Sequence, residues 1–449
     1  MDSMNPMDPT DPMDPMDPMD PTDPTDPTDP TEAANPEPPA PRARPARPAR
    51  PAGAVPLPLD GITVVAVEQA VSAPFATRQL ADLGARVVKV ERPDGGDFAR
   101  GYDTAAGGLA SHFVWANRGK ESLALDLKDP RGREVLHGLL AGADVFVQNL
   151  AQGAAARLGL DAATLCARYD RLVAVDISGY GPEGPYAQKR AYDMLVQCEA
   201  GLVSVTGTPS RPVKAGIPAA DIAAAMYAFS GVLAALLRRG TTGRGGRVEV
   251  SMLDALAEWM GHPLHHTMHG GEQPARTGLA HAVIAPYDAY GTADGDQVLL
   301  SVQNDREWRR LAEQVLGRPE LAEDPAYATN AARTAHRAQT DAVVAEALGR
   351  LGAAEALERL EGAGIACARL NSVAQLAGHP QLAARDRWRE VRTPAGPLRA
   401  LLPPIVLPDG AEPRMGAVPA LGEHTEALLC ALGMTGAQIS ALRRDGVIA

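Results

Sequence analysis

From Leu57 onward, short apolar segments alternate with segments of helical spacing, and this alternation constrains the fold more than any other feature. Residues 62–67 and 85–90 have the apolar, β-branched composition of buried strands, and residues 73–83 between them repeat apolar side chains with a helical period. A strand, a helix and a strand in this order indicate a βαβ unit. Further strands are predicted at 122–127, 145–148 and 172–177, and a helix at 130–140. We therefore predict an α/β fold with a parallel, doubly wound sheet.

The second half of the chain has a different pattern. A long helical stretch, residues 217–238, precedes a strand at 248–250, and residues 286–302 then alternate like a hairpin around Asp294-Gly295. Amphipathic helices follow as far as Leu360, which indicates a smaller α+β domain. The predicted organisation is a large domain at 56–250, a linker at 251–275, the small domain at 276–375, and a return to the large domain at 376–449 that contains a last helix at 423–432.

The N-terminal 55 residues differ in composition from the remaining chain. Met-Asp-Pro and Thr-Asp-Pro triplets are followed by a Pro-, Ala- and Arg-rich stretch, so we predict a disordered tail, residues 1–55. Nine Asp, two Glu and four Arg give this tail a charge of −7 out of −12 for the whole chain. The remainder is close to neutral for its size, so no nucleic-acid partner is expected, although a local basic pocket for a phosphate-bearing ligand is allowed.

No N-terminal segment joins basic residues to an apolar stretch, and no uninterrupted apolar run has the length of a membrane span. We therefore expect a cytoplasmic protein without a membrane partner.

Two common nucleotide-binding loops are missing. The turn after the first predicted strand, residues 68–74, lacks the GxGxxG glycines, and no GxxxxGK[ST] loop occurs, so a nicotinamide enzyme or a P-loop NTPase has little support. Histidines at helical spacing, namely His262, His265, His266 and His269, lack an HExxH motif and a carboxylate at third-ligand spacing. Packed or hydrogen-bonded histidines are favoured over a zinc site, and we expect no metal.

Several segments occur together in a fixed order. They are Leu83-Gly-Ala-Arg-Val-Val-Lys-Val-Glu-Arg-Pro93 with Gly95-Gly-Asp97, Asn117-Arg-Gly-Lys120, Leu125-Asp-Leu-Lys128, Ser178-Gly-Tyr-Gly-Pro-Glu-Gly-Pro185, Ala191-Tyr-Asp193, Thr206-Gly207, Thr242-Gly-Arg-Gly245 and Gly422-Glu-His-Thr425. In this order they resemble the class III CoA transferases, of the formyl-CoA and carnitine-CoA transferase type, over about residues 57–448.

The resemblance implies an interlocked homodimer, in which each chain has a Rossmann-like large domain built from both chain ends and a smaller domain between them. It also implies a CoA thioester as substrate, with no permanently bound cofactor. The family's CoA contacts correspond to Arg92, Leu125, Asp126, Leu127, Lys128, Asn149 and Arg157. Guanidinium and ammonium groups suit the CoA phosphates, and the two leucines suit the adenine.

Catalysis in the family uses a carboxylate that attacks the thioester and forms a mixed anhydride. The residue at that position, three after the glycine of Thr206-Gly207, is Ser210. A serine needs a general base, and its acyl ester is too stable to pass the acyl group on easily. The neighbouring carboxylates Asp193, Glu199 and Asp221 could substitute only if the loop rearranges. Asp193 and Asp221 are the two that we would test, although both are also placed to cap a helix.

Three functions remain open at this point. Segments around Arg276 and His281 resemble the branch of the family that handles short dicarboxylic acids, and either side chain could hold a distal carboxylate or make a structural contact. CoA transfer from an acyl-CoA such as succinyl-CoA to a dicarboxylic acid is the favoured function. The alternatives are a CoA-thioester-binding protein without turnover and an acyl-CoA racemase, whose His-Asp pair corresponds here to Tyr192 and Asp221.

Overall fold

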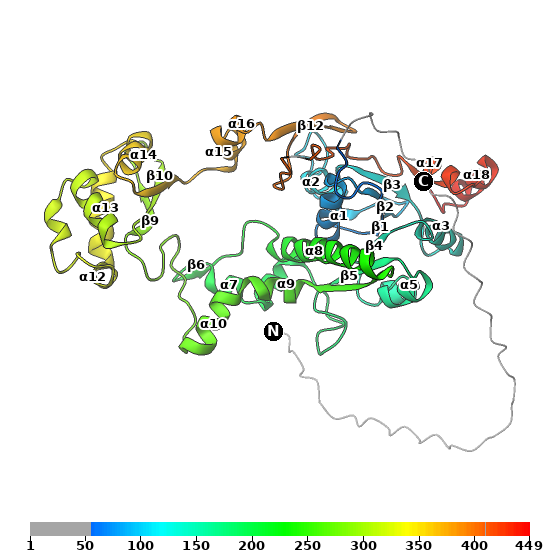
Figure 1. Cartoon of the computed structure of the whole chain (residues 1–449), viewed down its shortest axis with the longest axis horizontal. Coiled ribbons are helices and arrows are strands. Elements are labelled where there is room, and N and C mark those ends of the chain that lie inside the picture. The colour runs from blue at the N-terminus through cyan, green and yellow to red at the C-terminus, as the bar shows by residue number, and fades with distance from the viewer. Residues whose placement is uncertain (1–54, 409) are drawn as a thin grey trace, which may run out of the picture. The chain divides into compact units, whose positions relative to one another are not determined.

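The computed structural model describes residues 55–408 and 410–449, so the predicted disordered tail lies outside the described residues apart from Val55. A six-stranded parallel sheet with the order β3-β2-β1-β4-β5-β8 forms the centre (Figure 1). Its strands are β1 (Thr63–Val67), β2 (Arg86–Glu91), β3 (Lys120–Ala124), β4 (Val145–Gln148), β5 (Val173–Ser178) and β8 (Gly246–Ser251). The predicted α/β fold with a parallel sheet is confirmed.

Helices cover both faces of this sheet. Val64 and Ala66 of β1 pack against α1 (Ser72–Asp82), α8 (Ala219–Thr242) and α9 (Met252–Trp259), whereas Val65 and Val67 belong to the core of the opposite face. That second core includes residues of α3 (Pro130–Leu140), α5 (Ala162–Arg168), α17 (Thr425–Ala431) and α18 (Gly436–Arg444). The alternation of side chains along each strand therefore buries both sides, as in doubly wound sheets.

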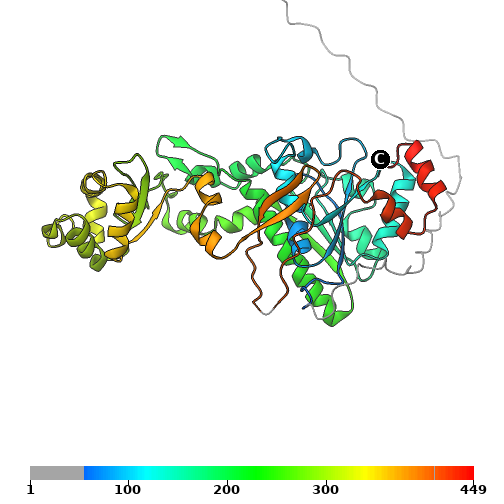
Figure 2. The same ribbon diagram turned by 90° about the horizontal axis from the view of Figure 1, so that it is seen from above.

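The C-terminal segment returns to the sheet. Ile448 forms an antiparallel bridge with Leu125, next to the end of β3, and Figure 2 shows α17 and α18 in red beside the cyan elements of the first half. The helix predicted at 423–432 is α17, but α18 was not predicted. The strand predicted at 122–127 was placed wrongly by two to three residues, since β3 is Lys120–Ala124. Leu125 still donates its N–H to the carbonyl of Glu91, but its antiparallel bridge is with Ile448 of the C-terminal segment.

Helix α8 is longer than predicted, since it continues through Gly240 to Thr242 and ends at Gly243 in the left-handed conformation. By length and composition it is the one helix among the described residues that would be able to cross a membrane. This is weak evidence, because the core helix of a soluble protein passes the same test. One face of α8, including Ala220, Ala223, Ala224 and Ala228, is buried in the core shared with α1.

A second, antiparallel sheet has the order β11-β10-β9. Strands β9 (Tyr287–Gly291) and β10 (Gln297–Ser301) form the predicted hairpin around Asp294-Gly295, whereas β11 (Ala366–Arg369) was not predicted. The core of this part centres on Trp308 and contains residues of α11 (Asp305–Arg310), α13 (Arg337–Leu348) and α14 (Ala353–Gly362). The domain boundaries stay a prediction.

The remaining elements are short connections and edge structures. The helical ones are η1 (Phe98–Gly101), α2 (Ser111–Asn117), α4 (Ala154–Arg157), α6 (Asp193–Glu199), α7 (Leu202–Val205), α10 (Gly261–Gly270), η2 (Leu311–Val315), η3 (Pro319–Ala322), α12 (Asn330–Ala335), α15 (Val373–Ala377) and α16 (Pro380–Ala384). Two hairpins complete the set, β6 (Gly207–Thr208) with β7 (Arg211–Pro212), and β12 (Trp388–Thr393) with β13 (Gly396–Leu401).

Candidate functional site

The strand order reverses between β1 and β4, and open α/β sheets bind ligands outside the carboxyl ends of the strands at such a point. Asn149, which follows β4, joins the two strand ends: its Oδ1 accepts the backbone N–H of Gln69 at 2.9 Å, and its Nδ2 donates to the carbonyl of Gln69 at 2.9 Å. The same Nδ2 lies 3.1 Å from the hydroxyl of Ser72, at the start of α1. Asn149 therefore fixes the turn that closes the switch point.

A pocket of about 370 Å³ opens at this edge of the sheet. It is lined by the last residues of β1 and β2, by residues that follow β1, β2, β3 and β4, and by one residue after α18: Val67, Glu68, Gln69, Val90, Glu91, Arg92, Pro93, Asp94, Gly96, Asp97, Leu125, Asp126, Leu127, Lys128, Leu150, Ala154, Leu158 and Gly446. Five of the seven residues that the resemblance assigns to CoA are in this lining. Arg92 and Lys128 are exposed, whereas Leu125 is buried and faces both the pocket and the core.

The other two assigned residues lie beside the lining. Asn149 precedes Leu150, and Arg157 is on α4 between Ala154 and Leu158, which both line the pocket. The structure thus brings the predicted CoA-binding positions together around one pocket.

Arg133 was not predicted, yet it shapes the wall formed by residues 125–128. Its guanidinium donates to the carbonyls of Leu127 at 3.0 Å and Lys128 at 2.9 Å. Gly132 permits a close approach on the same side, since a Cβ there would lie 2.0 Å from the carbonyl oxygen of Asp126. The sequence signal for this contact is the Arg-Gly-Arg run in the first turn of α3.

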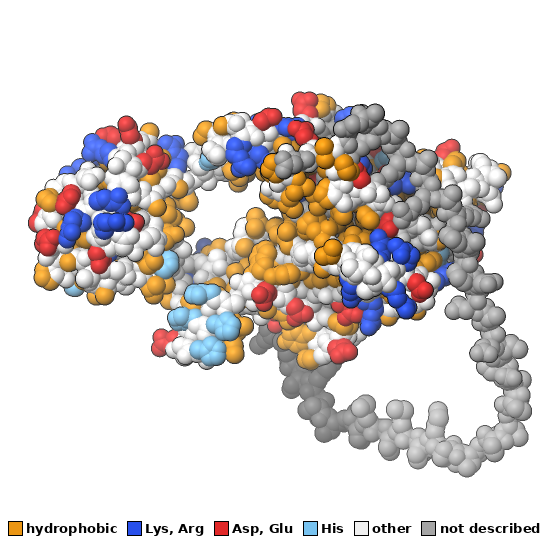
Figure 3. Space-filling view, in the orientation of Figure 1, with side chains coloured by type: hydrophobic (Ala, Val, Ile, Leu, Met, Phe, Trp, Pro, Cys, Tyr) orange, Lys and Arg blue, Asp and Glu red, His pale blue; other side chains and the backbone are white. Residues whose placement is uncertain are grey.

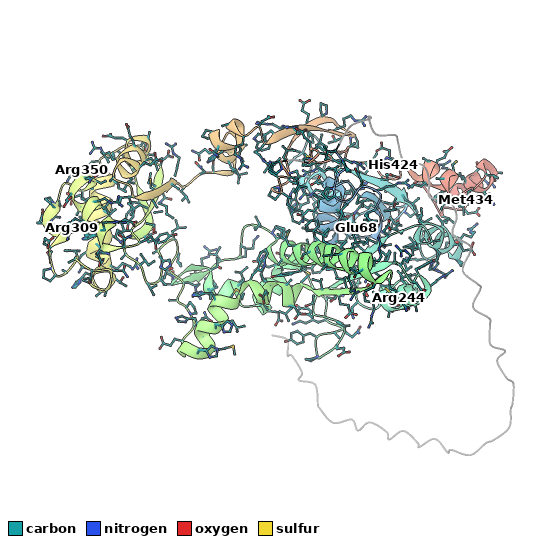
Figure 4. All side chains as sticks on the ribbon, viewed as in Figure 1. Glu68, Arg244, Arg309, Arg350, His424 and Met434 are labelled. Carbon is teal, nitrogen blue, oxygen red and sulfur yellow. The ribbon has the colours of Figure 1, made fainter. Side chains whose placement is uncertain are left out.

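Charged side chains are buried beneath the pocket, where Figure 4 labels Glu68. Glu68 Oε1 lies 2.6 Å from Lys120 Nζ and 3.5 Å from Lys89 Nζ, and Lys89 Nζ lies 2.8 Å from Asp97 Oδ2. Next to them, Arg100 binds the Glu91 carboxylate through two nitrogens, at 2.8 and 2.7 Å. Three acids and three bases therefore balance one another. We call these six side chains the floor network: Glu68, Lys89, Glu91, Asp97, Arg100 and Lys120.

Burial and pairing act against each other on the pKa values of the floor network. Burial lowers the pKa of Lys120 to about 7, because lost hydration outweighs the attraction of Glu68. Burial alone would raise the pKa of Glu68, but the ammonium groups of Lys120 and Lys89 hold it below its ordinary value. Burial likewise opposes ionisation of Glu91, yet the hydrogen bonds from Arg100 bring its pKa to about 2.

Asp193 is the first residue of α6 and Asp221 lies in the first turn of α8, where the carboxylate of Asp193 reaches the backbone. Asp193 Oδ1 accepts the backbone N–H groups of Ala220 at 2.8 Å and Asp221 at 3.2 Å, and its Oδ2 accepts Nε2 of Gln197 at 2.6 Å. The capping role considered for Asp193 is found at a different helix: Asp193 begins α6, which has no side-chain cap, and its carboxylate instead caps α8. Burial, and then the charge of Asp193, raise the pKa of Asp221 to about 7, although the hydroxyl and amide of Ser72 bind its carboxylate.

Ser210 occupies the two-residue loop of the β6–β7 hairpin and is exposed, with its hydroxyl 3.3 Å from that of Thr208. Arg276 contacts this hairpin: its guanidinium donates to the carbonyls of Ser204 (3.0 Å), Thr208 (3.0 Å) and Pro209 (3.1 Å). Ser210, Asp193 and Asp221 are not among the residues that line the described pocket.

His281 is partly buried and makes local contacts. Its ring stacks on Tyr287 with centroids 5.2 Å apart, and its Nδ1 lies 3.2 Å from the backbone nitrogen of Val283. Neither this arrangement nor that of Arg276 tests the predicted carboxylate-binding role.

The histidines of α10 form an exposed group that Figure 3 shows in pale blue. The rings of His265 and His269 stack at 5.6 Å, and Nδ1 of His266 lies 3.1 Å from the carbonyl of Glu272. Within residues 55–408 and 410–449, no group of three or more His, Cys, Asp or Glu side chains is placed to hold a metal ion.

A parallel sheet with a pocket over its carboxyl edge, rimmed by Arg92 and Lys128, is the arrangement of α/β enzymes that bind phosphate-bearing ligands. Residues 59–425 match CoA-transferase family III, and the chain belongs to this family. The protein is therefore a CoA-transferase, and the resemblance inferred from its motifs is confirmed.

Individual relatives agree with this family. The chain is 33% identical over 384 residues to a succinate–glutarate CoA-transferase of Agrobacterium fabrum, covering 84% of this chain and 96% of that protein. It is 36% identical over 331 residues to an acetyl-CoA:oxalate CoA-transferase of Acetobacter aceti, covering 73% and 85%. A crystal structure of a CAIB/BAIF family protein from Brucella suis superposes with a TM-score of 0.77 at 32% identity, covering 84% of this chain and all of that one.

Proposed function

We propose that the protein transfers CoA between an acyl-CoA, such as succinyl-CoA, and a short dicarboxylic acid. The observation that carries this proposal is the gathering of Arg92 and Leu125–Lys128 around one pocket at the switch point of the sheet. Two relatives named for glutarate and oxalate support dicarboxylic acids as substrates. Arg92 and Lys128 would hold the CoA phosphates, and Leu127 would pack against the adenine.

The proposed chemistry passes through an acyl-enzyme anhydride. An enzyme carboxylate attacks the thioester carbonyl, the C–S bond breaks, and the CoA thiolate stays bound. The acceptor carboxylate then attacks the enzyme's acyl carbon and displaces the donor acid, which forms a second mixed anhydride. The thiolate finally attacks the acceptor's carbonyl, so that a new thioester forms and the enzyme carboxylate is released. An anhydride is activated enough to pass its acyl group to the bound thiolate, and each step exchanges one activated acyl bond for another, so the sequence can run in both directions.

Asp221 is the carboxylate that we propose for this attack. Ser210 has no carboxylate, and Asp193 already accepts three hydrogen bonds that cap α8 and hold Gln197. Asp221 contacts Ser72, which contacts Asn149, which in turn holds Gln69 in the pocket wall. Poor hydration makes a carboxylate such as Asp221 a stronger nucleophile once it is ionised.

The departure at Ser210 favours a second candidate, a CoA-thioester-binding protein without turnover. One experiment distinguishes the transferase, the binding protein and the acyl-CoA racemase considered above. The protein is incubated with succinyl-CoA and a panel of dicarboxylic acids in D₂O, and the products are measured by mass spectrometry. New acyl-CoA species without deuterium support the transferase. Unchanged succinyl-CoA that still binds would mean binding alone, and deuterium at the α-carbon would indicate the racemase.

We also propose that the protein is a homodimer. Exposed large hydrophobic residues occur on α8 and near α6 and α10, and Figure 3 shows hydrophobic side chains gathered over α8. Leu237 is 77% exposed, Tyr192 65% and Met268 64%, which is typical of surfaces that a partner covers. Sedimentation of the full chain tests the proposal, and a monomer at micromolar concentration would contradict it.

A further inference from the structure

The walls of the pocket formed by the ends of β1 and β2 meet at one carboxylate. Asp97 Oδ1 accepts the backbone N–H of Ala70 at 3.0 Å, from the turn after β1, and that of Ala99 at 2.9 Å, from the segment after β2. Its Oδ2 receives Lys89 at 2.8 Å, and Asp97 is 1% exposed. A single side chain thus ties both turns together and is itself held by a buried cation.

Both turns that Asp97 contacts have backbone conformations that depend on support from their surroundings. Ala70 has a φ of 60°, a left-handed conformation that a non-glycine residue keeps only where its surroundings enforce it. The other turn reverses through Gly95 and Gly96, with φ of 75° and 68°. The carbonyl of Gly96 lies 3.4 Å from both Nε and NH2 of Arg92 at the pocket rim.

Both turns that Asp97 holds contain residues that line the pocket. Gln69 precedes Ala70, while Arg92, Pro93 and Asp94 belong to the turn that ends at Asp97. A shift of either turn would change the distance between Gln69 and Arg92 across the pocket. Such shifts matter because binding groups must be held within about 0.5 Å of their productive geometry.

We infer that Asp97 is a positioning residue for CoA binding. Its Oδ1 fixes the position of the turn after β1 relative to the turn after β2, and its negative charge balances that of Lys89. The inference rests on the proposed function of the pocket. The Asp97 carboxylate has two roles: it accepts hydrogen bonds from two backbone amides, and it neutralises a buried ammonium group. Substitutions can remove these roles one at a time.

The test compares two double variants with the same charge. Lys89→Met with Asp97→Asn removes the ion pair but keeps an oxygen for the amides of Ala70 and Ala99. Lys89→Met with Asp97→Ala removes the ion pair and that oxygen. Calorimetric titration with CoA should give a dissociation constant within about threefold of wild type for the first, and at least about tenfold weaker for the second, since two hydrogen bonds are lost.

Controls separate positioning from stability. Asp82 is also buried, accepts two hydrogen bonds from Arg118 at 2.9 and 2.8 Å, and does not line the described pocket. Asp82→Asn should lower the melting temperature and leave CoA affinity unchanged. If the alanine double variant does not fold, Gly96→Ala replaces it. A Cβ there would lie 2.9 Å from Glu91 Oε2, so it should displace the turn and weaken CoA binding.

The outcomes are distinct. Equal CoA affinity in the two double variants, or an unchanged affinity in Gly96→Ala, would overturn the inference and leave the proposed function intact. A wild-type protein that does not bind CoA would overturn both.

Discussion

Asp193 binds the backbone of Asp221: its Oδ1 lies 3.2 Å from the amide nitrogen of Asp221 at the start of α8. The two carboxylates therefore occupy one helix N-terminus with different partners. Asp193 accepts hydrogen bonds from the backbone of α8. Burial and the neighbouring charge of Asp193 raise the pKa of Asp221. The two carboxylates therefore have different environments, and Asp221 keeps its proton to a higher pH than an ordinary aspartate does.

The first prediction concerns stability against pH. The pKa of Asp221 is raised from 3.8 to about 7 on folding, so the folded state binds more protons than the unfolded state between these values. The contribution of Asp221 to stability therefore falls as pH rises from 4 to 7. Asp221→Asn removes this dependence, and its free energy of unfolding should exceed that of wild type by about 2 kcal/mol more at pH 8 than at pH 5. Urea unfolding of both proteins at the two pH values measures this, and a difference that does not vary with pH would contradict it.

The second prediction concerns Asp193. Asp193→Ala removes the acceptor for two amides of α8 and should cost about 1–2 kcal/mol of unfolding free energy. Asp193→Asn keeps an acceptor oxygen and should recover most of that loss. Both variants should retain CoA exchange, because we propose that Asp221, and not Asp193, forms the anhydride. A folded Asp193→Asn variant without exchange activity would place the carboxylate of Asp193 in the chemistry.

Sequence pattern predicted the sheet better than it predicted the site. The sequences of β1, β4 and β5 are so uniformly apolar that the strand positions can be predicted from them directly. The predicted and observed bounds of β4 are the same at both ends. The shift in β3 arose because Leu125 and Leu127 continue the apolar pattern after the strand has ended. Their neighbours determine where the strand stops: Leu125 bridges to Ile448, more than 300 residues away, and no local pattern contains that contact.

The floor network was missed for a related reason. In the β2 segment Arg-Val-Val-Lys-Val-Glu, Lys89 and Glu91 look like residues of a solvent-exposed face. Both faces of the sheet are covered, however, so these charges are buried and must find partners from β1, β3 and η1. The pocket residues Arg92 and Leu125–Lys128 came instead from the family resemblance, which carried positions that composition alone would not distinguish.

The third prediction concerns CoA affinity. Arg92→Ala and Lys128→Ala should each weaken CoA binding about tenfold, because each removes a cation from the pocket rim. The loss should be larger at low ionic strength, where screening is weaker. Arg309→Ala is the control, since Arg309 is exposed and pairs with Glu323 at 3.1 Å in another part of the chain. Titration calorimetry at two salt concentrations measures all three, and wild-type affinity in both rim variants would show that the pocket assignment is wrong.

The last prediction concerns Ser210 and Asp221 together. If Asp221 forms the anhydride, Ser210→Ala should leave succinyl-CoA exchange intact, while Asp221→Asn should abolish both exchange and the hydroxylamine-trapped adduct. Ser210→Glu should add a second carboxylate on the exposed β6–β7 loop. The anhydride that this carboxylate forms, unlike a serine ester, is activated enough to pass the acyl group on.

A double variant then identifies which carboxylate carries the reaction. This variant carries both Ser210→Glu and Asp221→Asn. If it regains CoA exchange, the hairpin loop still reaches the thioester, and Asp221 substitutes in wild type for the carboxylate that is missing from position 210. The trapped adduct should then move from a peptide containing Asp221 to one containing position 210, as peptide mass spectrometry measures. Arg276→Ala should weaken this restored activity, because the hairpin would lose two hydrogen bonds from the guanidinium, at the carbonyls of Thr208 and Pro209. Exchange that persists in Asp221→Asn with no change in the trapped peptide would exclude Asp221 as the nucleophile.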